Sequence, residues 1–145
     1  MQIKDLYAIV VTEKRVQSRD FYVRWFGFQV VFEASWFVYL AAAGEHPFGI
    51  AFMSPDHPSQ PPGPDVFSGK GMFLTLQVED AAAEFERLRR AGLTIAHLLH
   101  DEPWGQRRFA VYDHSGMWVD VVQQIEPAPG FWDRYVSPES TTAQE

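Results

Sequence analysis

The chain has 145 residues, of which 46% are hydrophobic and 21% charged, a composition typical of one soluble globular domain with its own core. With 12 basic against 19 acidic residues and a net charge of −7, it lacks the basic clusters that a nucleic-acid partner requires. It has no cysteine, so it has no disulfide or thiolate metal site. It also has no apolar run near the roughly 18 residues of a membrane span and no signal peptide, so we expect a cytoplasmic protein.

The first third of the chain is predicted to run strand, helix and three strands. Leu6 to Thr12 is an apolar run rich in β-branched residues, which suits a buried strand. Arg15 to Phe26 has a broad apolar helical face and ends at Gly27, which suits the positive φ of a C-terminal cap. The next strands are expected at Phe28 to Glu33, Trp36 to Ala41 and Phe48 to Met53.

Residues 54–71 carry five prolines and three glycines and are predicted to be an irregular connector. A strand is expected at Met72 to Val78, followed by a helix with Asp80 as its N-cap and Gly92 as its stop. The elements after it are three strands, a Pro-rich segment in which Phe131, Trp132 and Tyr135 could dock, and a frayed end. The three strands are expected at Leu93 to Leu99, Arg108 to Tyr112 and Met117 to Gln123. The tail covers 126–145, and its frayed part is Ser137 to Glu145.

The order of elements in the first part recurs in the second, which indicates an internal repeat. We therefore predict one α+β domain over 1–145, made of two βαβββ modules at 3–54 and 72–125. Each module has a sheet with one face under its helix, so the other face must be covered or form a site.

Three segments resemble motifs of the vicinal oxygen chelate superfamily, which includes glyoxalases, bleomycin-resistance proteins and dioxygenases. They are Ser18 to Tyr22 with Phe26-Gly27-Phe28, Val78 to Asp80 with Ala91-Gly92, and Asp113 to Gln123. The resemblance implies two mixed, curved sheets in a pseudo-two-fold arrangement that forms a cup. It also implies a homodimer, and the long connector is compatible with modules exchanged between subunits.

In enzymes of this superfamily the cup holds a metal, whose ligands come from the first and last strands of each module. By this resemblance the ligand positions fall on Tyr7, Phe73, Asp120 and the apolar stretch 50–52. Phe cannot ligate a metal, and Asp120 would be the one carboxylate present. We therefore expect no metal and no other cofactor.

Alternation along the strands predicts which side chains line the cup instead. Phe73 and Trp118 could equally fill a narrow cup as core residues, and Asp120 is more readily read as paired with an arginine such as Arg108 than as catalytic. The candidate ligand-binding residues are Tyr7, Trp36, Tyr39, Phe52, Phe73, Trp104, Tyr112, Trp118 and Asp120.

Other aromatic and histidine residues are assigned structural roles. Helical spacing places Phe21, Trp25, Phe26 and Phe85 in the core. No pair of histidines has metal-ligand spacing, and all five are predicted at the surface or in turns: His46, His57, His97, His100 and His114.

The aromatic content of 15% and the acidic charge favour a small-molecule guest that is drug-like, flat and aromatic, or cationic. The first hypothesis is a metal-free protein that confers antibiotic resistance by sequestration, like the bleomycin-resistance branch. The second is a glyoxalase, dioxygenase or epimerase type of enzyme, which needs a metal or an acid–base pair such as Asp120 with Tyr7. The third is a regulatory domain with a vestigial cup.

Overall fold

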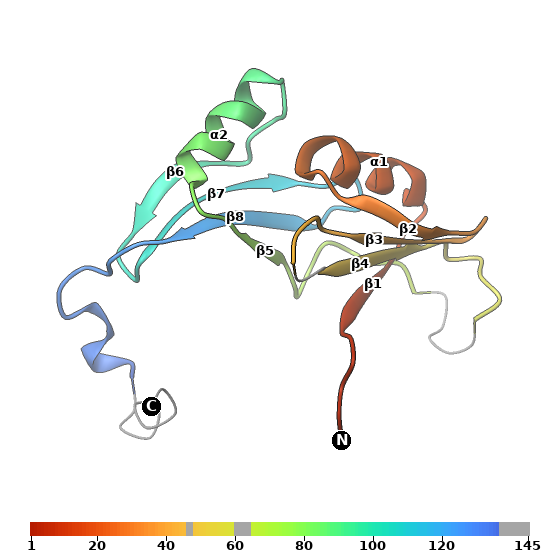
Figure 1. Ribbon diagram of the computed structural model, residues 1–145, viewed down its shortest axis with the longest axis horizontal. Helices are drawn as coiled ribbons and strands as arrows, with labels where there is room; N and C mark the ends of the chain where they lie inside the picture. The colour runs from red at the N-terminus through yellow and green to blue at the C-terminus, as the bar shows by residue number, and fades with distance from the viewer. Residues whose placement is uncertain (46–47, 60–64, 137–145) are drawn as a thin grey trace. The chain divides into compact units, whose positions relative to one another are not determined.

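The computed structural model describes residues 1–45, 48–59 and 65–136, and in them two four-stranded sheets each carry one α-helix (Figure 1). The α+β class and the two βαβββ modules are confirmed. The first module comprises β1 (Tyr7–Val11), α1 (Arg15–Phe26), β2 (Gln29–Glu33), β3 (Phe37–Ala41) and β4 (Gly49–Met53). The second comprises β5 (Leu74–Gln77), α2 (Ala81–Arg90), β6 (His97–Glu102), β7 (Gln106–Tyr112) and β8 (Trp118–Gln124), and a 3-10 helix follows at Phe131–Arg134.

The two sheets have the same strand order, which is the structural form of the repeat. The first runs β1-β4-β3-β2 and the second β5-β8-β7-β6, so in each module the first strand pairs with the last. In the first sheet β1 pairs with β4 in parallel, and β3 pairs antiparallel with both β4 and β2. In the second sheet β6 and β7 are antiparallel.

The chain divides into two compact units that do not coincide with the modules. The first unit contains Met1–Leu74 together with Tyr112–Val119, and the second contains Thr75–Val111 and Asp120–Glu145. The tip of the β7–β8 hairpin is therefore part of the unit that contains α1.

The helix ends follow the local sequence signals. Gly27 caps α1 with a φ of 70°, and the Asp80 side chain accepts a hydrogen bond of 3.0 Å from Ala83 N at the start of α2. Phe21 on α1 is buried, whereas Trp25 is half-buried with the Arg24 guanidinium 4.5 Å from its ring centroid. Trp25 therefore lies at the margin of the core rather than inside it.

The second module departs from the predicted ranges at β6 and β5. β6 begins at His97 instead of Leu93 and extends to Glu102, and β7 already starts at Gln106, so a tight turn joins them. Backbone pairing of Asp101 with Arg107 and of Glu102 with Gln106 continues the hairpin to its end, and the Asp101–Arg107 ion pair at 2.7 Å lies across it. β5 begins at Leu74.

Several sequence-based expectations concern the irregular segments. In the described connector residues, 54–59 and 65–71, the chain forms no helix or strand, as predicted. The expected fraying of 137–145 and the surface position of His46 lie outside the described residues. Among the residues that the structure describes, no helix is long and apolar enough to cross a membrane.

The carboxylate of Asp113 joins the hairpin tip to α1 inside the first unit. Its Oδ2 accepts a hydrogen bond of 2.8 Å from the Tyr22 hydroxyl, and its Oδ1 accepts from Ser115 N and Oγ and from Met117 N at 2.6 to 3.0 Å. Tyr22 is fully buried and Asp113 is 6% exposed. Because both groups are buried, breaking this network would leave each of them with neither water nor this hydrogen-bond partner, which would cost stability.

We predict that Tyr22 makes the stability of the protein fall at alkaline pH. Burial, and then the neighbouring Asp113 charge, raise the pKa of Tyr22 well above its usual value near 10. Above about pH 10 the unfolded state releases the phenolic proton while the folded state keeps it, so the free energy of unfolding declines as pH rises. Urea unfolding at a series of pH values from 8 to 11 measures this.

The control is Tyr22→Phe, which removes the ionisable group and leaves Asp113 Oδ2 without its buried donor. This variant should lose about 1–3 kcal/mol at neutral pH and show a shallower alkaline decline than the natural chain. An equal decline in both proteins would contradict the assignment. Tyr135→Phe, at a site 61% exposed, should match the natural chain.

Candidate functional site

The face of the first sheet that lies away from α1 is apolar and rich in aromatic side chains; we call it the aromatic face. Figure 1 shows α1 along the opposite face, where Val10 and Val38 are buried. Strand register places the alternate residues on the aromatic face. They are Tyr7, Ile9, Val11, Gly49, Ala51, Met53, Phe37, Tyr39, Ala41, Phe32 and Gln29.

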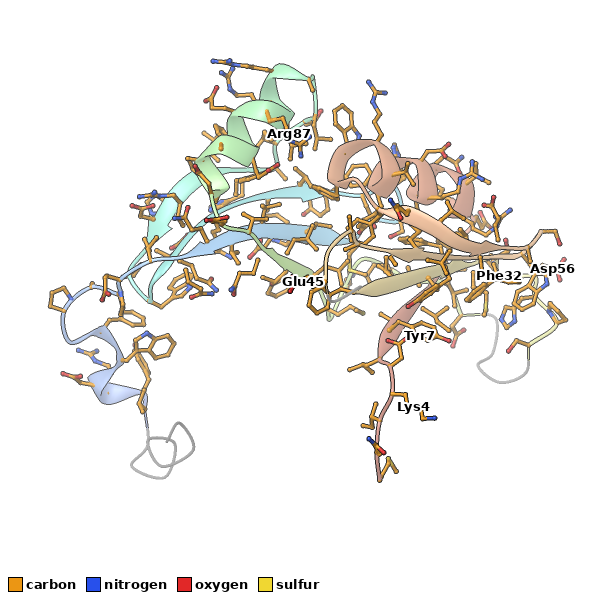
Figure 2. All side chains as sticks on the ribbon, viewed as in Figure 1. Lys4, Tyr7, Phe32, Glu45, Asp56 and Arg87 are labelled. Atoms are coloured by element: carbon orange, nitrogen blue, oxygen red, sulfur yellow. The ribbon has the colours of Figure 1, made fainter. Side chains whose placement is uncertain are left out.

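Solvent reaches this face over aromatic and branched side chains. Tyr7 and Ile9 are each 43% exposed, and Phe32 on the far edge strand is 58% exposed. Tyr7 and Phe32 are labelled in Figure 2. A face with this composition suits an apolar, flat guest or a second protein surface.

Tyr7 and Tyr39 form the centre of the aromatic face. Their ring centroids are 4.9 Å apart in an edge-to-face arrangement, and the Tyr39 hydroxyl donates a 3.3 Å hydrogen bond to Asp5 Oδ2. Partial burial, and then the Asp5 charge, raise the pKa of Tyr39, which keeps the hydroxyl protonated as the donor. The Tyr39 ring lies directly over Gly49, where any Cβ would collide with it. Glycine at this position therefore sets the place of the ring.

Trp36 and His57 lie together beside the start of β3. Their rings are stacked with centroids 6.2 Å apart, and Trp36 also contacts Phe37 of the aromatic face. His57 is only 8% exposed, so its prediction as a surface or turn residue is wrong. The reason is that the connector turns back over Trp36, which the sequence pattern does not reveal.

The remaining aromatic candidates do not join the Tyr7–Tyr39 pair. Phe52 is fully buried on the α1 side, with its ring 5.4 Å from that of Tyr22, so it is a core residue and not part of the aromatic face. Phe73 precedes β5 and is 58% exposed, which does not fit a core-filling role. Tyr112 and Trp118 face each other across the hairpin with ring centroids 5.2 Å apart.

The corresponding face of the second sheet, which we call the polar face, carries the Tyr112–Trp118 pair by strand alternation and, further along β7 and β8, the polar and charged side chains of Arg108, Asp120 and Gln124. Phe109 contacts Phe85 of α2, and Gln123 Oε1 accepts a hydrogen bond from Ala81 N, so these side chains mark the helix-covered side. On the other side Gln124 Nε2 donates to Gln77 Oε1 at 3.1 Å, and the charged cluster described next lies beside them on β7 and β8.

Arg108 holds two carboxylates in this polar face. Its Nη1 donates to Asp120 Oδ2 at 2.8 Å and its Nε donates to Glu102 Oε1 at 3.2 Å. Burial by itself would lower the pKa of Arg108, but the hydrogen bonds to these carboxylates outweigh it and raise the pKa. The predicted pairing of Asp120 with Arg108 is confirmed.

Trp104 is already engaged by the protein. The Arg108 guanidinium carbon lies 5.2 Å from its ring centroid, its Nε1 donates to Gln106 Oε1, and the Phe131 ring lies 6.4 Å away. Trp132 Nε1 donates to the Trp104 carbonyl at 2.8 Å, so the 3-10 helix docks here. Trp104 thus anchors the C-terminal segment, and the docking of that segment agrees with the sequence-based expectation.

Sequence reasoning missed several members of the aromatic face and the partner carboxylate Glu102. Phe32 was missed because a register shift between Val30 and Phe32 breaks simple alternation in β2. Gly49 carries no sequence signal beyond its position at a strand start. Glu102 lies beyond the predicted end of β6 at Leu99, and its role appears only once this strand is seen to reach it.

The residues at the expected metal positions do not fit a divalent metal. Tyr7 offers a phenol and not the imidazole or carboxylate that a divalent metal prefers, Phe73 has no donor atom, and Asp120 is ion-paired with Arg108. Within 1–45, 48–59 and 65–136, no group of three or more His, Asp or Glu side chains is placed to hold a metal ion.

The chain belongs to the Glyoxalase/Bleomycin resistance protein/Dioxygenase superfamily, whose family model matches residues 8–121. This range includes all eight strands except the first residue of β1 and the end of β8. No curated protein matches the chain.

Solved structures resemble the chain in fold. A glyoxalase/bleomycin resistance protein/dioxygenase from Nocardioides is 18% identical, with a TM-score of 0.70 over 90% of this chain and 89% of its own. A superfamily member from Sphaerobacter thermophilus DSM 20745 is 21% identical, with a TM-score of 0.67 over 86% and 99%. TioX from Micromonospora sp. ML1 is 20% identical, with a TM-score of 0.63 over 85% and 100%. At these identities the likeness establishes the fold alone.

We predict that Gly49→Ala displaces the Tyr39 ring from the aromatic face. The added Cβ has no room beneath the ring, which must swing away and release Asp5. NMR spectra should show altered ring resonances for Tyr39 and Tyr7, with a loss of unfolding free energy of about 1 kcal/mol.

The matched test is a double-mutant cycle with Tyr39→Ala. Once the ring is absent, Gly49→Ala should cost no more than a few tenths of a kcal/mol, within the error of additivity. Additive effects of the two substitutions would show that Gly49 does not position Tyr39.

Proposed function

We propose that this protein is a metal-independent binding protein for flat aromatic, drug-like molecules, and that it acts in antibiotic resistance by sequestering them. The observation that carries the proposal is the solvent-accessible Tyr7–Tyr39 pair on an otherwise apolar face. Such a surface offers edge and face contacts to a planar guest, and sequestration needs affinity without bond chemistry.

The charge distribution bears on whether the expected guest must carry a positive charge. The carboxylates of Asp101, Glu102 and Asp120 are bonded to Arg107 and Arg108 and are not free to attract a cation. Three carboxylates against two guanidinium groups leave a local net charge of −1. The aromatic surface therefore supports the proposal more than the acidic charge does, and a positive charge on the guest is not required.

We expect tryptophan fluorescence to be quenched by a guest of this class. Trp36 contacts Phe37 at the edge of the aromatic face and can report binding there. Titration with bleomycin, mitomycin and quinoxaline-type antibiotics should give saturable quenching at micromolar concentration. Tyr39→Ala should weaken it about tenfold, which corresponds to ~1.4 kcal/mol of lost ring contact.

Tyr135→Ala is the matched control, because it removes the same side chain from a site that is 61% exposed in the second unit. Its titration should superimpose on that of the natural chain. Absence of quenching by all three antibiotics, or equal weakening by both substitutions, would contradict binding at the aromatic face.

We further propose that the protein is a homodimer in which modules can be exchanged between subunits. Exposed Tyr7, Ile9 and Phe32 make the aromatic face a large apolar surface for a monomer, and a second subunit would cover part of it. Analytical ultracentrifugation at micromolar concentration should report twice the chain mass. A single monomeric species across the concentration range would refute the dimer.

A further inference from the structure

The Asp120–Arg108–Glu102 cluster combines two carboxylates with one guanidinium in poorly solvated surroundings. The side chains of Asp120 and Glu102 are 3% and 11% exposed, and that of Arg108 is 23% exposed. Carboxylates this far removed from water need a cation beside them, because unpaired buried charge is strongly destabilising.

The cation in this cluster is part of the chain. One guanidinium reaches both acidic side chains through different nitrogen atoms, at 2.8 Å for Nη1 to Asp120 and 3.2 Å for Nε to Glu102. The Trp104 ring lies over the same group, with the guanidinium carbon 5.2 Å from its centroid. Planar donors of fixed direction allow this double pairing, which a lysine ammonium at the end of a flexible stem would not reproduce.

We infer that Arg108 is a built-in cation that occupies the place where Asp120 and Glu102 would otherwise bind a divalent metal ion. Two nearby carboxylates completed by water are a typical weak site for a hard cation such as Mn²⁺. With Arg108 between them, each carboxylate already has a cationic partner, one of the two negative charges is offset, and a metal would have to displace a guanidinium held by two hydrogen bonds. Arg108 is thus the residue that makes this position metal-independent, and the inference rests on that part of the proposed function.

The test is a Mn²⁺ titration followed by electron paramagnetic resonance, which measures free Mn²⁺. The natural chain should bind none at this position, whereas Arg108→Ala should bind one Mn²⁺ per chain. The double variant Arg108→Ala with Asp120→Asn should weaken that binding by at least about tenfold, since it removes one of the two carboxylates. Arg108→Lys keeps the positive charge but not the double hydrogen bond, so it should bind Mn²⁺ more weakly than Arg108→Ala.

Two results would overturn the inference. One is stoichiometric Mn²⁺ binding by the natural chain that Asp120→Asn abolishes. The other is a folded Arg108→Ala protein that binds Mn²⁺ no better than the natural chain. If that variant is unfolded as purified, Mn²⁺ should restore cooperative melting, and failure to do so also overturns the inference.

A second variant tests whether the space left by Arg108→Ala, and not the lost charge, causes the Mn²⁺ binding. Arg108→Gln has an uncharged side chain that is longer than that of alanine and can still hydrogen-bond one carboxylate, and it should also gain Mn²⁺ binding. These titrations contain no antibiotic, so a failure of the fluorescence experiment leaves them unaffected. Conversely, Mn²⁺ binding at Asp120 in the natural chain would contradict the proposed metal independence. The quenching experiment would still test separately whether a guest binds at the aromatic face.

Discussion

The carboxylate of Asp113 is the constraint around which the first compact unit is organised. It accepts a hydrogen bond from the Tyr22 hydroxyl, on a helix 91 residues earlier in the chain, and it also fixes the backbone of its own turn. Because Tyr22 packs against Phe52 of β4, the same contact links the hairpin tip, α1 and the first sheet. The α1 side of that sheet is thereby closed, and the aromatic face is the side that remains for other contacts.

The two sheets share a strand order but present different chemistry on the faces away from their helices. The first sheet offers Tyr7, Tyr39 and Phe32, whereas the second offers the Tyr112–Trp118 pair, glutamine amides and the Arg108 ion cluster. A repeat therefore need not imply two equivalent sites, because strand order is set by backbone pairing and buried packing while the exposed positions can diverge. In this chain the aromatic surface and the charged cluster have separate physical roles.

Local sequence signals predicted local structure well. Asp80 and Gly27 mark the helix ends because capping chemistry depends on a few neighbouring residues. Predictions that depended on strand register were less successful. Phe52 faces α1 and Phe32 faces away from it, and in β2 a register shift decides the orientation. Trp104 was predicted to be a ligand-binding residue, but its contact with Trp132 depends on how distant segments pack and could not be predicted.

The sequence by itself determined the α+β class, the repeated order of elements, the absence of cysteine chemistry and the mismatch at the superfamily's metal positions. The first three follow from composition, periodicity and residue type, and the mismatch follows from the residue types at the positions that the family resemblance assigns. Only the tertiary structure decided that Tyr39 lies over Gly49, that His57 is buried against Trp36, and that one arginine holds both Asp120 and Glu102. Each of these depends on how strands and loops far apart in the chain are aligned, and hydrophobic pattern does not specify that alignment.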